Sequence, residues 1–423
     1  MHLIHKFKET LSALSGRQKR LAVLAVLVTV FSIFGYFTVS TANGVPVTRW
    51  MNIYHPGDFK NIPEMLTYLK DLRVPIPPVF SIMEILDYQA TGNYQFVTVT
   101  LYRLGLVLVY ITVIVLASGS YGKMIPAFFL SLLFLWSTKV IHGGNPQVYD
   151  IYLPLFVLLF LLFTRLAASG PYAVGKRMVL FAVSAGFFLS MAELSRPYMI
   201  LFLPFLAVWA YVKIGRRQKR IFLYFLIPVL LFSGLWHLKL LVFNGQLTWS
   251  NHTGFNLAKC WVFVEKPPLL PEPDTPLKPK RWNNLNTVEH LENSRRIQAE
   301  IINYILKNPL AGTAHIFRRV THLMSAPTRL YKYNPLKRHP TLYLYKFLVM
   351  ILSSYLFINV GRLIVLGFKT GKRFLKRLLA PDHLLILITF VSFLLLSLGE
   401  TGEESRFLIS LLPFLAVLPT VQG

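Results

Sequence analysis

The chain has 423 residues, of which 54% are hydrophobic and 15% are charged, and its mean hydropathy is +0.51. A soluble globular domain carries about 25% charged residues, so this composition excludes an ordinary soluble enzyme and favours a protein embedded in a membrane. The formal net charge of +26 points to anionic lipid or an anionic substrate, and we expect no nucleic-acid partner. The one cysteine, Cys260, excludes an intrachain disulfide and cysteine-based metal ligation.

Long apolar runs recur along the whole chain. An α-helix needs about 20 apolar residues to cross a hydrocarbon core about 30 Å thick. The first run is too long for a signal-peptide core and has no small-residue cleavage site, so we expect it to be retained as a span. We predict an all-α polytopic membrane protein with about ten spans, at residues 21–40, 99–117, 124–141, 151–167, 178–193, 198–212, 221–243, 342–366, 383–398 and 407–420.

Short basic clusters beside these runs predict the orientation of the chain. The positive-inside rule assigns the clusters at residues 5–20, 176–177, 213–220 and 369–377 to the cytoplasm. Both termini then lie in the cytoplasm, and the remaining polar segments share the opposite face, which we call the far face. These far-face segments are residues 41–98, 142–150, 193–198, 244–340 and 399–406. We interpret residues 1–423 as a single membrane domain in which loops 41–98 and 244–340 are the two large external additions.

Both large loops contain amphipathic segments. In loop 41–98, apolar residues at helical spacing over 59–72, and a second segment beginning near 81–86, predict helices that lie in the interface without crossing it. In loop 244–340, residues 287–306 predict an amphipathic helix that could continue over 310–324. This loop has 14 Lys and Arg residues against 6 Asp and Glu residues. The excess could attract anionic headgroups or bind an anionic substrate, and the two interpretations are compatible.

Two aspartates lie where far-face segments meet predicted helices. Asp58 precedes the helix at 59–72 and could accept a proton from a hydroxyl group, with helix capping as the other interpretation. His55 and Glu64 are its polar neighbours. Asp150 follows Tyr149 and opens the span at 151–167, where it could cap the helix or help to position a ligand.

Two arginines are candidate phosphate ligands. Arg196 belongs to the segment 193–198, which we predict to be a tight polar turn, and it could pair with Glu193 or hold a phosphate through two hydrogen bonds. Arg406 lies in the tail segment 399–407, where charges between two apolar runs are costly to hold without a function. An ion pair with Glu404 is the other interpretation of that segment.

Motifs of several enzyme classes are missing from the sequence. It has no Walker loop, no dinucleotide-binding glycine motif, no H-E-x-x-H and no serine-hydrolase elbow. The eleven histidines lack metal-ligand spacing. We therefore predict no metal ligand and no certain cofactor, and dependence on a divalent cation stays open.

In their order along the chain, these features resemble the GT-C superfamily of membrane glycosyltransferases, and most closely its protein O-mannosyltransferase and aminoarabinose-transferase branch. Residues 54–58, Tyr-His-Pro-Gly-Asp, resemble the catalytic first external loop of that family. Asp150 resembles its second membrane-edge aspartate, and residues 193–197 resemble the turn whose basic residue contacts the lipid phosphate. Residues 304–309, followed by Phe-Arg-Arg at 317–319, resemble the helix leading into the late spans, and Glu-Ser-Arg-Phe at 404–407 resembles the signature near the end of many members.

The resemblance implies a GT-C-like bundle that transfers a sugar from a polyprenyl-phosphate donor to a lipid-linked glycan or protein at the far face. It implies inversion by single displacement, with Asp58 as the general base and Asp150 as a second catalytic carboxylate. The donor phosphate would lie on Arg196, Arg103 and Arg406. Membrane lipids are further partners, and a bacterial inner membrane with a periplasmic site is favoured over a eukaryotic location. The expected substrate contacts are His55, Glu64, Tyr149, Glu404, His252 and Asn256.

Two other classes stay open. An O-antigen-type ligase or polymerase also has many spans and a large basic external loop, but its first external loop is usually short, whereas loop 41–98 is long. A non-enzymatic lipid-glycan transporter should show charged or Gly/Pro-broken spans and an internal repeat. The middle of each predicted span is almost uniformly apolar, which argues against a transporter.

Overall fold

The computed structural model describes residues 16, 23, 26, 30, 63–64, 67, 78–91, 101–117, 148–169, 175–215, 218–245, 254, 257, 288–315, 317, 340–370 and 380–399. This part of the chain is helical and contains no β-strand, which agrees with the all-α prediction. Its elements are α4 (Pro78–Thr91), α5 (Tyr102–Ala117), α7 (Val148–Ala168), α8 (Lys176–Ser195), η4 (Pro197–Leu201), α9 (Leu203–Ala210), η5 (Tyr211–Gly215), α10 (Lys219–Pro228), η6 (Val229–Gly234), α11 (Leu235–Asn244), α13 (Val288–Lys307), α16 (Pro340–Thr370) and α18 (Pro381–Gly399).

Three stretches among the described residues are long and apolar enough to cross a membrane: Ile151–Ala168, Lys176–Ser195 and Lys219–Asn244. They coincide with the predicted spans 151–167, 178–193 and 221–243. The predicted spans 99–117, 198–212, 342–366 and 383–398 fall on shorter apolar helices. Span 21–40 is described only at Val23, Val26 and Val30, and spans 124–141 and 407–420 lie outside the described residues, so the total of about ten stays a prediction.

The α5 and α7 helices run parallel to each other. The Tyr152 hydroxyl, near the start of α7, donates to the Leu101 carbonyl oxygen at the start of α5, at 2.9 Å. Near the opposite ends, Arg165 Nη1 donates to the Leu116 carbonyl oxygen at 3.4 Å. A carbonyl in the last turn of a helix, such as that of Leu116, has no partner within its own helix, and the Arg165 donor satisfies it.

The α7 and α8 helices are antiparallel. Phe156 of α7 stacks on Phe188 of α8 with ring centroids 6.2 Å apart, and Phe163 packs against Phe181 at 6.0 Å. Residues seven positions later in α7 therefore contact residues seven positions earlier in α8. The same relation puts the beginning of α7 level with the end of α8.

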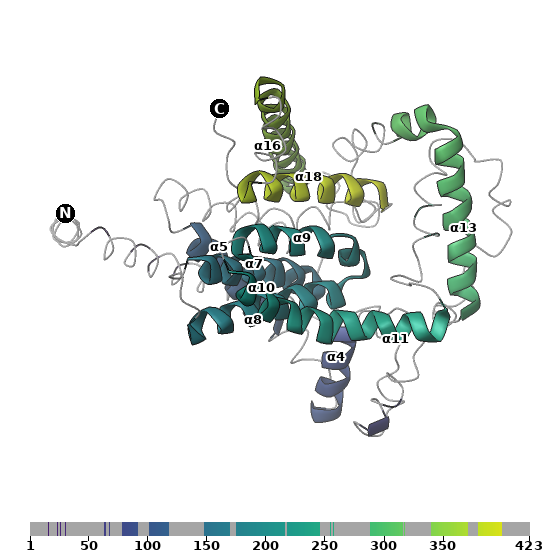
Figure 1. The fold of residues 1–423 in the computed structure, drawn as a ribbon. Coiled ribbons are helices and arrows are strands. Elements are labelled where there is room, and N and C mark those ends of the chain that lie inside the picture. The colour runs from purple at the N-terminus through teal and green to yellow at the C-terminus, as the bar shows by residue number, and fades with distance from the viewer. Residues whose placement is uncertain are drawn as a thin grey trace.

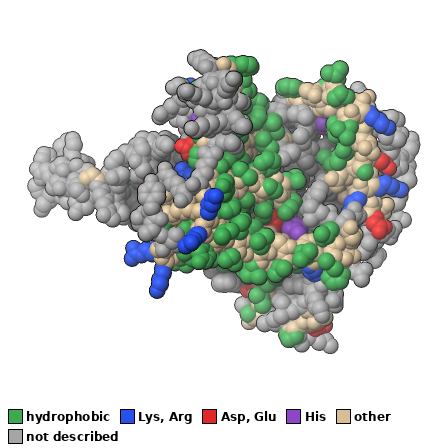
Figure 2. Space-filling model, viewed as in Figure 1, with side chains coloured by type: hydrophobic (Ala, Val, Ile, Leu, Met, Phe, Trp, Pro, Cys, Tyr) green, Lys and Arg blue, Asp and Glu red, His purple; other side chains and the backbone are tan. Residues whose placement is uncertain are grey.

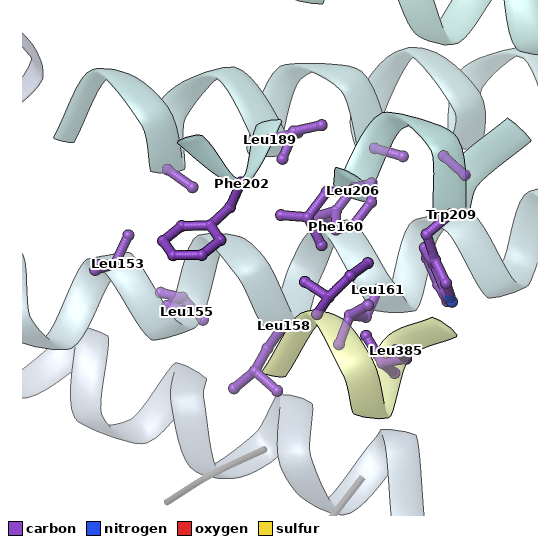
Figure 3. Close-up of a cluster of buried hydrophobic side chains, with 14 of the residues drawn as sticks. Leu153, Leu155, Leu158, Phe160, Leu161, Leu189, Phe202, Leu206, Trp209 and Leu385 are labelled. Atoms are coloured by element: carbon purple, nitrogen blue, oxygen red, sulfur yellow. The ribbon is translucent and has the colours of Figure 1, made fainter. Parts of the chain in front are cut away.

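The core lies where α7, α8, α9 and α18 meet (Figure 3). Phe160 of α7 contacts Trp209 of α9 edge to face at 5.5 Å and Phe225 of α10 at 6.2 Å. The Trp209 indole N–H donates to the Pro381 carbonyl oxygen at 2.8 Å, which attaches α9 to the start of α18. Figure 1 shows α7, α8 and α10 lying along one common direction, with α18 beside α9.

The span 219–244 is helical throughout but is not a regular α-helix. Between α10 and α11 the backbone forms the π-helical segment η6, directly after Pro228. Proline cannot donate its backbone nitrogen to the helix, and π segments inside α-helices recur at functional sites. Many large apolar residues of this span are exposed, among them Leu223, Leu230 and Val242. Such an apolar surface is what contact with lipid requires, and it contributes to the green surface that crosses the bundle in Figure 2.

Basic side chains gather where α8 and α10 begin (Figure 2). Lys176, Arg177, Lys219 and Arg220 are all exposed there. Since α7 is antiparallel to α8 and parallel to α5, the relative directions of these helices are those that the predicted topology requires. The α16 and α18 helices are antiparallel to each other. Phe357 contacts Phe390 with ring centroids 5.2 Å apart, whereas Leu363, further along α16, packs with Ile386, which lies earlier in α18.

We expect thiol labelling to place all the far-face segments on one side of the membrane. With Cys260 replaced by serine, single cysteines at Lys60, Gln147, Asn283 and Thr401 should react with a membrane-impermeant maleimide in intact cells. A cysteine at Lys213, in a basic cluster predicted to be cytoplasmic, should react only after the membrane is permeabilised. Protection of any of the four far-face positions from the reagent would contradict the prediction that these segments lie on one side of the membrane.

Two elements of the large external loops are described. The helix predicted to begin near 81–86 is present as α4, which packs against α8. The amphipathic helix predicted over 287–306 is confirmed as α13, and helical residues resume at Pro309 and reach His315. Of the predicted helix 59–72, the described residues Pro63, Glu64 and Thr67 are helical. Figure 1 shows α13 beyond the end of α11, running across the direction of the bundle.

The α8 and α10 helices lie close together at Gly186. A Cβ atom there would overlap the Phe225 carbonyl oxygen and lie 2.7 Å from Pro228 Cγ. Small residues permit such close contacts between membrane helices, which lack a hydrophobic force to hold them together.

Gly186→Ala should therefore lower the thermal unfolding midpoint of the purified protein by several degrees, because a backbone oxygen cannot move aside as a side chain can. Gly361→Ala is the matched control, since its Cβ would meet no atom within 4 Å. Alanine is a better helix former than glycine, so this control should be neutral or stabilising. Equal midpoints for the two variants would mean that the approach of α8 to α10 is not tight.

Candidate functional site

The buried faces of α8 and of the span 219–244 are apolar near the basic ends of these helices and include polar residues toward their other ends. In α8, Met178 and Ala182 are buried in the first half, whereas Ser190, Glu193 and Ser195 are buried in the second. In the span 219–244 the buried positions, in order, are Ile221, Phe225, Pro228, Val229, Ser233, His237 and Leu240. The spacing of three to four residues shows that Ser233 and His237 belong to the stripe that faces the protein.

The central contact is a buried pair between Glu193 and His237. His237 Nε2 and Glu193 Oε1 are 2.6 Å apart, and their residues are 9% and 2% exposed. Burying a carboxylate in an apolar bundle costs several kcal/mol unless it is paired and hydrogen-bonded. An ionisable pair inside a membrane bundle therefore marks a functional site by default.

Both residues lie at the same depth. Glu193 is 17 residues after Lys176 at the start of α8, and His237 is 18 residues after Lys219 at the start of α10. At 1.5 Å per residue, each lies about 25–27 Å from the end of the bundle that carries these basic residues. That distance approaches the full hydrocarbon thickness of about 30 Å, so the pair lies at the far edge of the apolar layer.

Arg196 follows directly after α8 and is 7% exposed. Its backbone N–H donates to the Glu193 carbonyl oxygen at 3.1 Å, and Pro197 then begins η4. The predicted polar turn over 193–198 is therefore wrong in its extent: α8 continues through Ser195, and the chain changes direction only at Arg196. This continuation turns the Glu193 side chain into the helix interface, where it contacts His237, a partner that the sequence does not suggest.

The same end of the bundle carries three more predicted site residues. Tyr149 and Asp150 belong to the first turn of α7, and Arg103 belongs to the first turn of α5; each is described only as part of its helix. The aromatic pairs between α7 and α8 place residue 150 level with residues 193–194. The hydrogen bond from Tyr152 to Leu101 brings the start of α5 to the same level.

Of the remaining predicted site residues, the structure describes only Glu64. Glu64 is helical and exposed. Asp58, His55, His252, Asn256, Glu404 and Arg406 lie outside the described residues, so their roles stay predictions.

The sequence interpretation did not select Ser233, His237 or Asp87. Asp87 is 5% exposed in α4, which packs against α8. The signal that could have identified His237 was its depth, because it stands as far from its basic flank as Glu193 does. The middle of the span 221–243 contains Pro228 and a π-helical segment, which weakens the argument that uniformly apolar mid-span positions make against a transporter.

This arrangement can hold a polar headgroup at the membrane edge. Arg196 can donate to an anion, the Glu193 carboxylate can accept from hydroxyl groups, and the His237 imidazole can do either. Within the described residues, no group of three or more His, Cys, Asp or Glu side chains could hold a metal ion. Comparison of the chain with models of known protein families, with curated proteins and with solved structures finds no match, so the meaning of this site depends on its own residues.

Proposed function

We propose that the protein is a membrane glycosyltransferase that moves a sugar from a polyprenyl-phosphate donor to a lipid-linked glycan or protein acceptor at the far face. The observation that supports this most is the buried Glu193–His237 pair beside the buried Arg196, at the end of the bundle where Asp150 and Arg103 also begin their helices. The resemblance of the chain to GT-C enzymes supplies the reaction. A bacterial inner membrane and a periplasmic site belong to the same proposal.

The physical demands of such a donor match the described part of the chain. A prenyl tail needs an apolar surface, and the span 219–244 exposes one. The phosphate needs a cation at the edge of the apolar layer, and Arg196, directly after α8, could supply it. The donor needs no nucleotide-binding loop because it arrives linked to a lipid.

The proposed chemistry is a single displacement at the anomeric carbon. The acceptor oxygen forms a bond to that carbon while the bond from the carbon to the phosphate oxygen breaks. The electron pair of the broken bond leaves with the lipid phosphate, which needs little protonation. Asp58 takes the proton of the acceptor, and Arg196 stabilises the charge that develops on the phosphate.

A lipid-glycan transporter is the second candidate, because the span 219–244 is interrupted by Pro228 and by η6 and carries a buried histidine. Discontinuous spans with buried polar groups are typical of transporter substrate sites. A transporter would move the lipid-linked sugar across the membrane unchanged. Proteoliposomes supplied with polyprenyl-phosphate sugars and with lipid-linked glycan or protein acceptors from an envelope extract separate the two functions. Only the transferase moves the sugar to the acceptor and releases sugar-free polyprenyl phosphate, which mass spectrometry detects.

In that assay, Arg196→Lys should raise the KM for the donor by roughly ten-fold or more, because lysine loses the two parallel hydrogen bonds of a guanidinium to phosphate. The fold should survive, since the positive charge remains. Arg177→Lys, at an exposed position on the cytoplasmic end, is the control and should behave as wild type. If donor use by Arg196→Lys is unchanged, or the variant does not fold, Arg196 is a structural residue.

A further inference from the structure

Three buried polar atoms at the far end of the bundle have no hydrogen-bond partner among the described residues. They are Glu193 Oε2, His237 Nδ1 and Ser233 Oγ. Buried side-chain polar atoms almost always have a partner, and an unsatisfied one calls for an explanation such as a bound ligand or water. The three residues lie where the far half of α8 packs against η6 and the start of α11, and we call these three residues the polar lining of that seam.

The three atoms belong to one stretch of that seam. Ser233 and His237 are four residues apart on the inward stripe of η6 and α11, so their side chains share one helix face. Glu193 reaches the same face through its contact with His237. One turn nearer the cytoplasm the seam is closed, because the Ser190 hydroxyl donates to the carbonyl oxygens of Gly186 and Pro228 at 3.0 and 3.2 Å.

The chemistry of this lining fits hydroxyl groups. The Glu193 carboxylate can only accept, the Ser233 hydroxyl can donate or accept, and His237 Nδ1 can do either according to its protonation. A second phosphate would be repelled by the Glu193 carboxylate, whereas sugar hydroxyls would donate to it. The phosphate of the same donor would instead bind Arg196, which follows Glu193 by three residues.

We propose that Glu193, Ser233 and His237 form the subsite that binds the sugar hydroxyls of a glycosyl phosphate, beside the phosphate subsite at Arg196. This assignment rests on the proposed function, because it assigns the sugar and the phosphate of one donor molecule to two neighbouring subsites. It predicts that these residues govern the preference for a glycosylated lipid over the same lipid without sugar, and that they do not govern binding of the phosphate.

The test measures lipid binding to the purified full-length protein in nanodiscs. The probes are undecaprenyl phosphate and the same lipid carrying mannose, glucose or aminoarabinose, titrated by intrinsic tryptophan fluorescence. Ser233→Ala removes one hydroxyl, and Glu193→Gln keeps the shape of the carboxylate while removing its charge. Thr164→Val is the matched control. The Thr164 Oγ1 atom is also buried without a partner among the described residues, but it lies near the end of α7, at the other end of the bundle from Glu193.

The wild type should bind at least one glycosylated lipid more tightly than undecaprenyl phosphate. Ser233→Ala and Glu193→Gln should each reduce this ratio by about ten-fold, the size of a lost hydrogen bond to a charged or buried group, while binding of undecaprenyl phosphate stays unchanged. Thr164→Val should keep the ratio. Should Glu193→Gln fail to fold, Ser233→Ala alone still decides the assignment.

Two results would overturn the assignment in different ways. If the wild type prefers a glycosylated lipid and the folded variants keep that preference, the lining holds structural water and the proposed function stands. If the wild type binds none of the four lipids saturably, the proposed function itself fails and the subsite fails with it.

Discussion

Replacing Asp58 with asparagine is expected to lower the rate of sugar transfer by about 10²- to 10⁴-fold, while expression and donor binding stay close to wild type. The reason is that asparagine keeps the size of aspartate and much of its helix-capping ability but cannot accept the acceptor's proton. The measurement is the initial rate of release of polyprenyl phosphate by reconstituted protein, with donor binding measured separately.

Two companion variants sharpen this test. Glu64→Gln alters an exposed carboxylate of the same loop and should keep most of the activity. Asp150→Asn tests the carboxylate that opens α7 level with Glu193. If Asp58→Asn transfers sugar at nearly the wild-type rate, Asp58 is not the base, and Asp150 or Glu404 becomes the next candidate.

The second large effect is expected on stability. Glu193→Leu should lower the free energy of unfolding by about 3 kcal/mol, because it leaves the buried His237 ring without its hydrogen-bond partner. The double variant Glu193→Leu/His237→Leu should recover most of this loss, since well-packed apolar residues commonly replace a buried pair without loss of stability. The unfolding midpoint of the purified proteins measures both.

The double variant also separates stability from function. It should fold and yet lose donor discrimination, because it carries neither polar group. Glu292→Leu, on the exposed face of α13, is the control and should change stability by no more than about 0.5 kcal/mol. A single variant Glu193→Leu as stable as the wild type would show that the pair is not buried in the folded protein.

The helices were predictable because their signals are local. The apolar run 151–167 and the amphipathic run 287–306 became α7 and α13 with ends shifted by at most a few residues. Interruptions within a span were harder to foresee. The run 198–212 proved to be η4, α9 and η5 in succession, and the run 221–243 contains η6, since proline and close packing against α8 override the simple hydropathy signal.

The candidate site was only partly predictable, because its central contact joins residues far apart in the chain. The chemistry of Arg196 and the position of Asp150 could be inferred from charge at the ends of apolar runs. The partner of Glu193 could not, since His237 lies 44 residues later and meets it only because α8 and the span 219–244 run in parallel from the same face. Sequence spacing reports neighbours on one helix, and it does not report which faces of two helices meet.

The central claim is that a polyprenyl-phosphate sugar binds at the far end of the bundle, beside Arg196 and the Glu193–His237 pair. The most direct test is photocrosslinking of the purified protein with a polyprenyl-phosphate sugar that carries a diazirine next to the phosphate, followed by peptide mapping. We expect labelled peptides from the end of α8 and from α11, and competition by unmodified donor. Labelling confined to the cytoplasmic end, at the beginning of α8 and α10, or labelling that unmodified donor does not compete away, would contradict it.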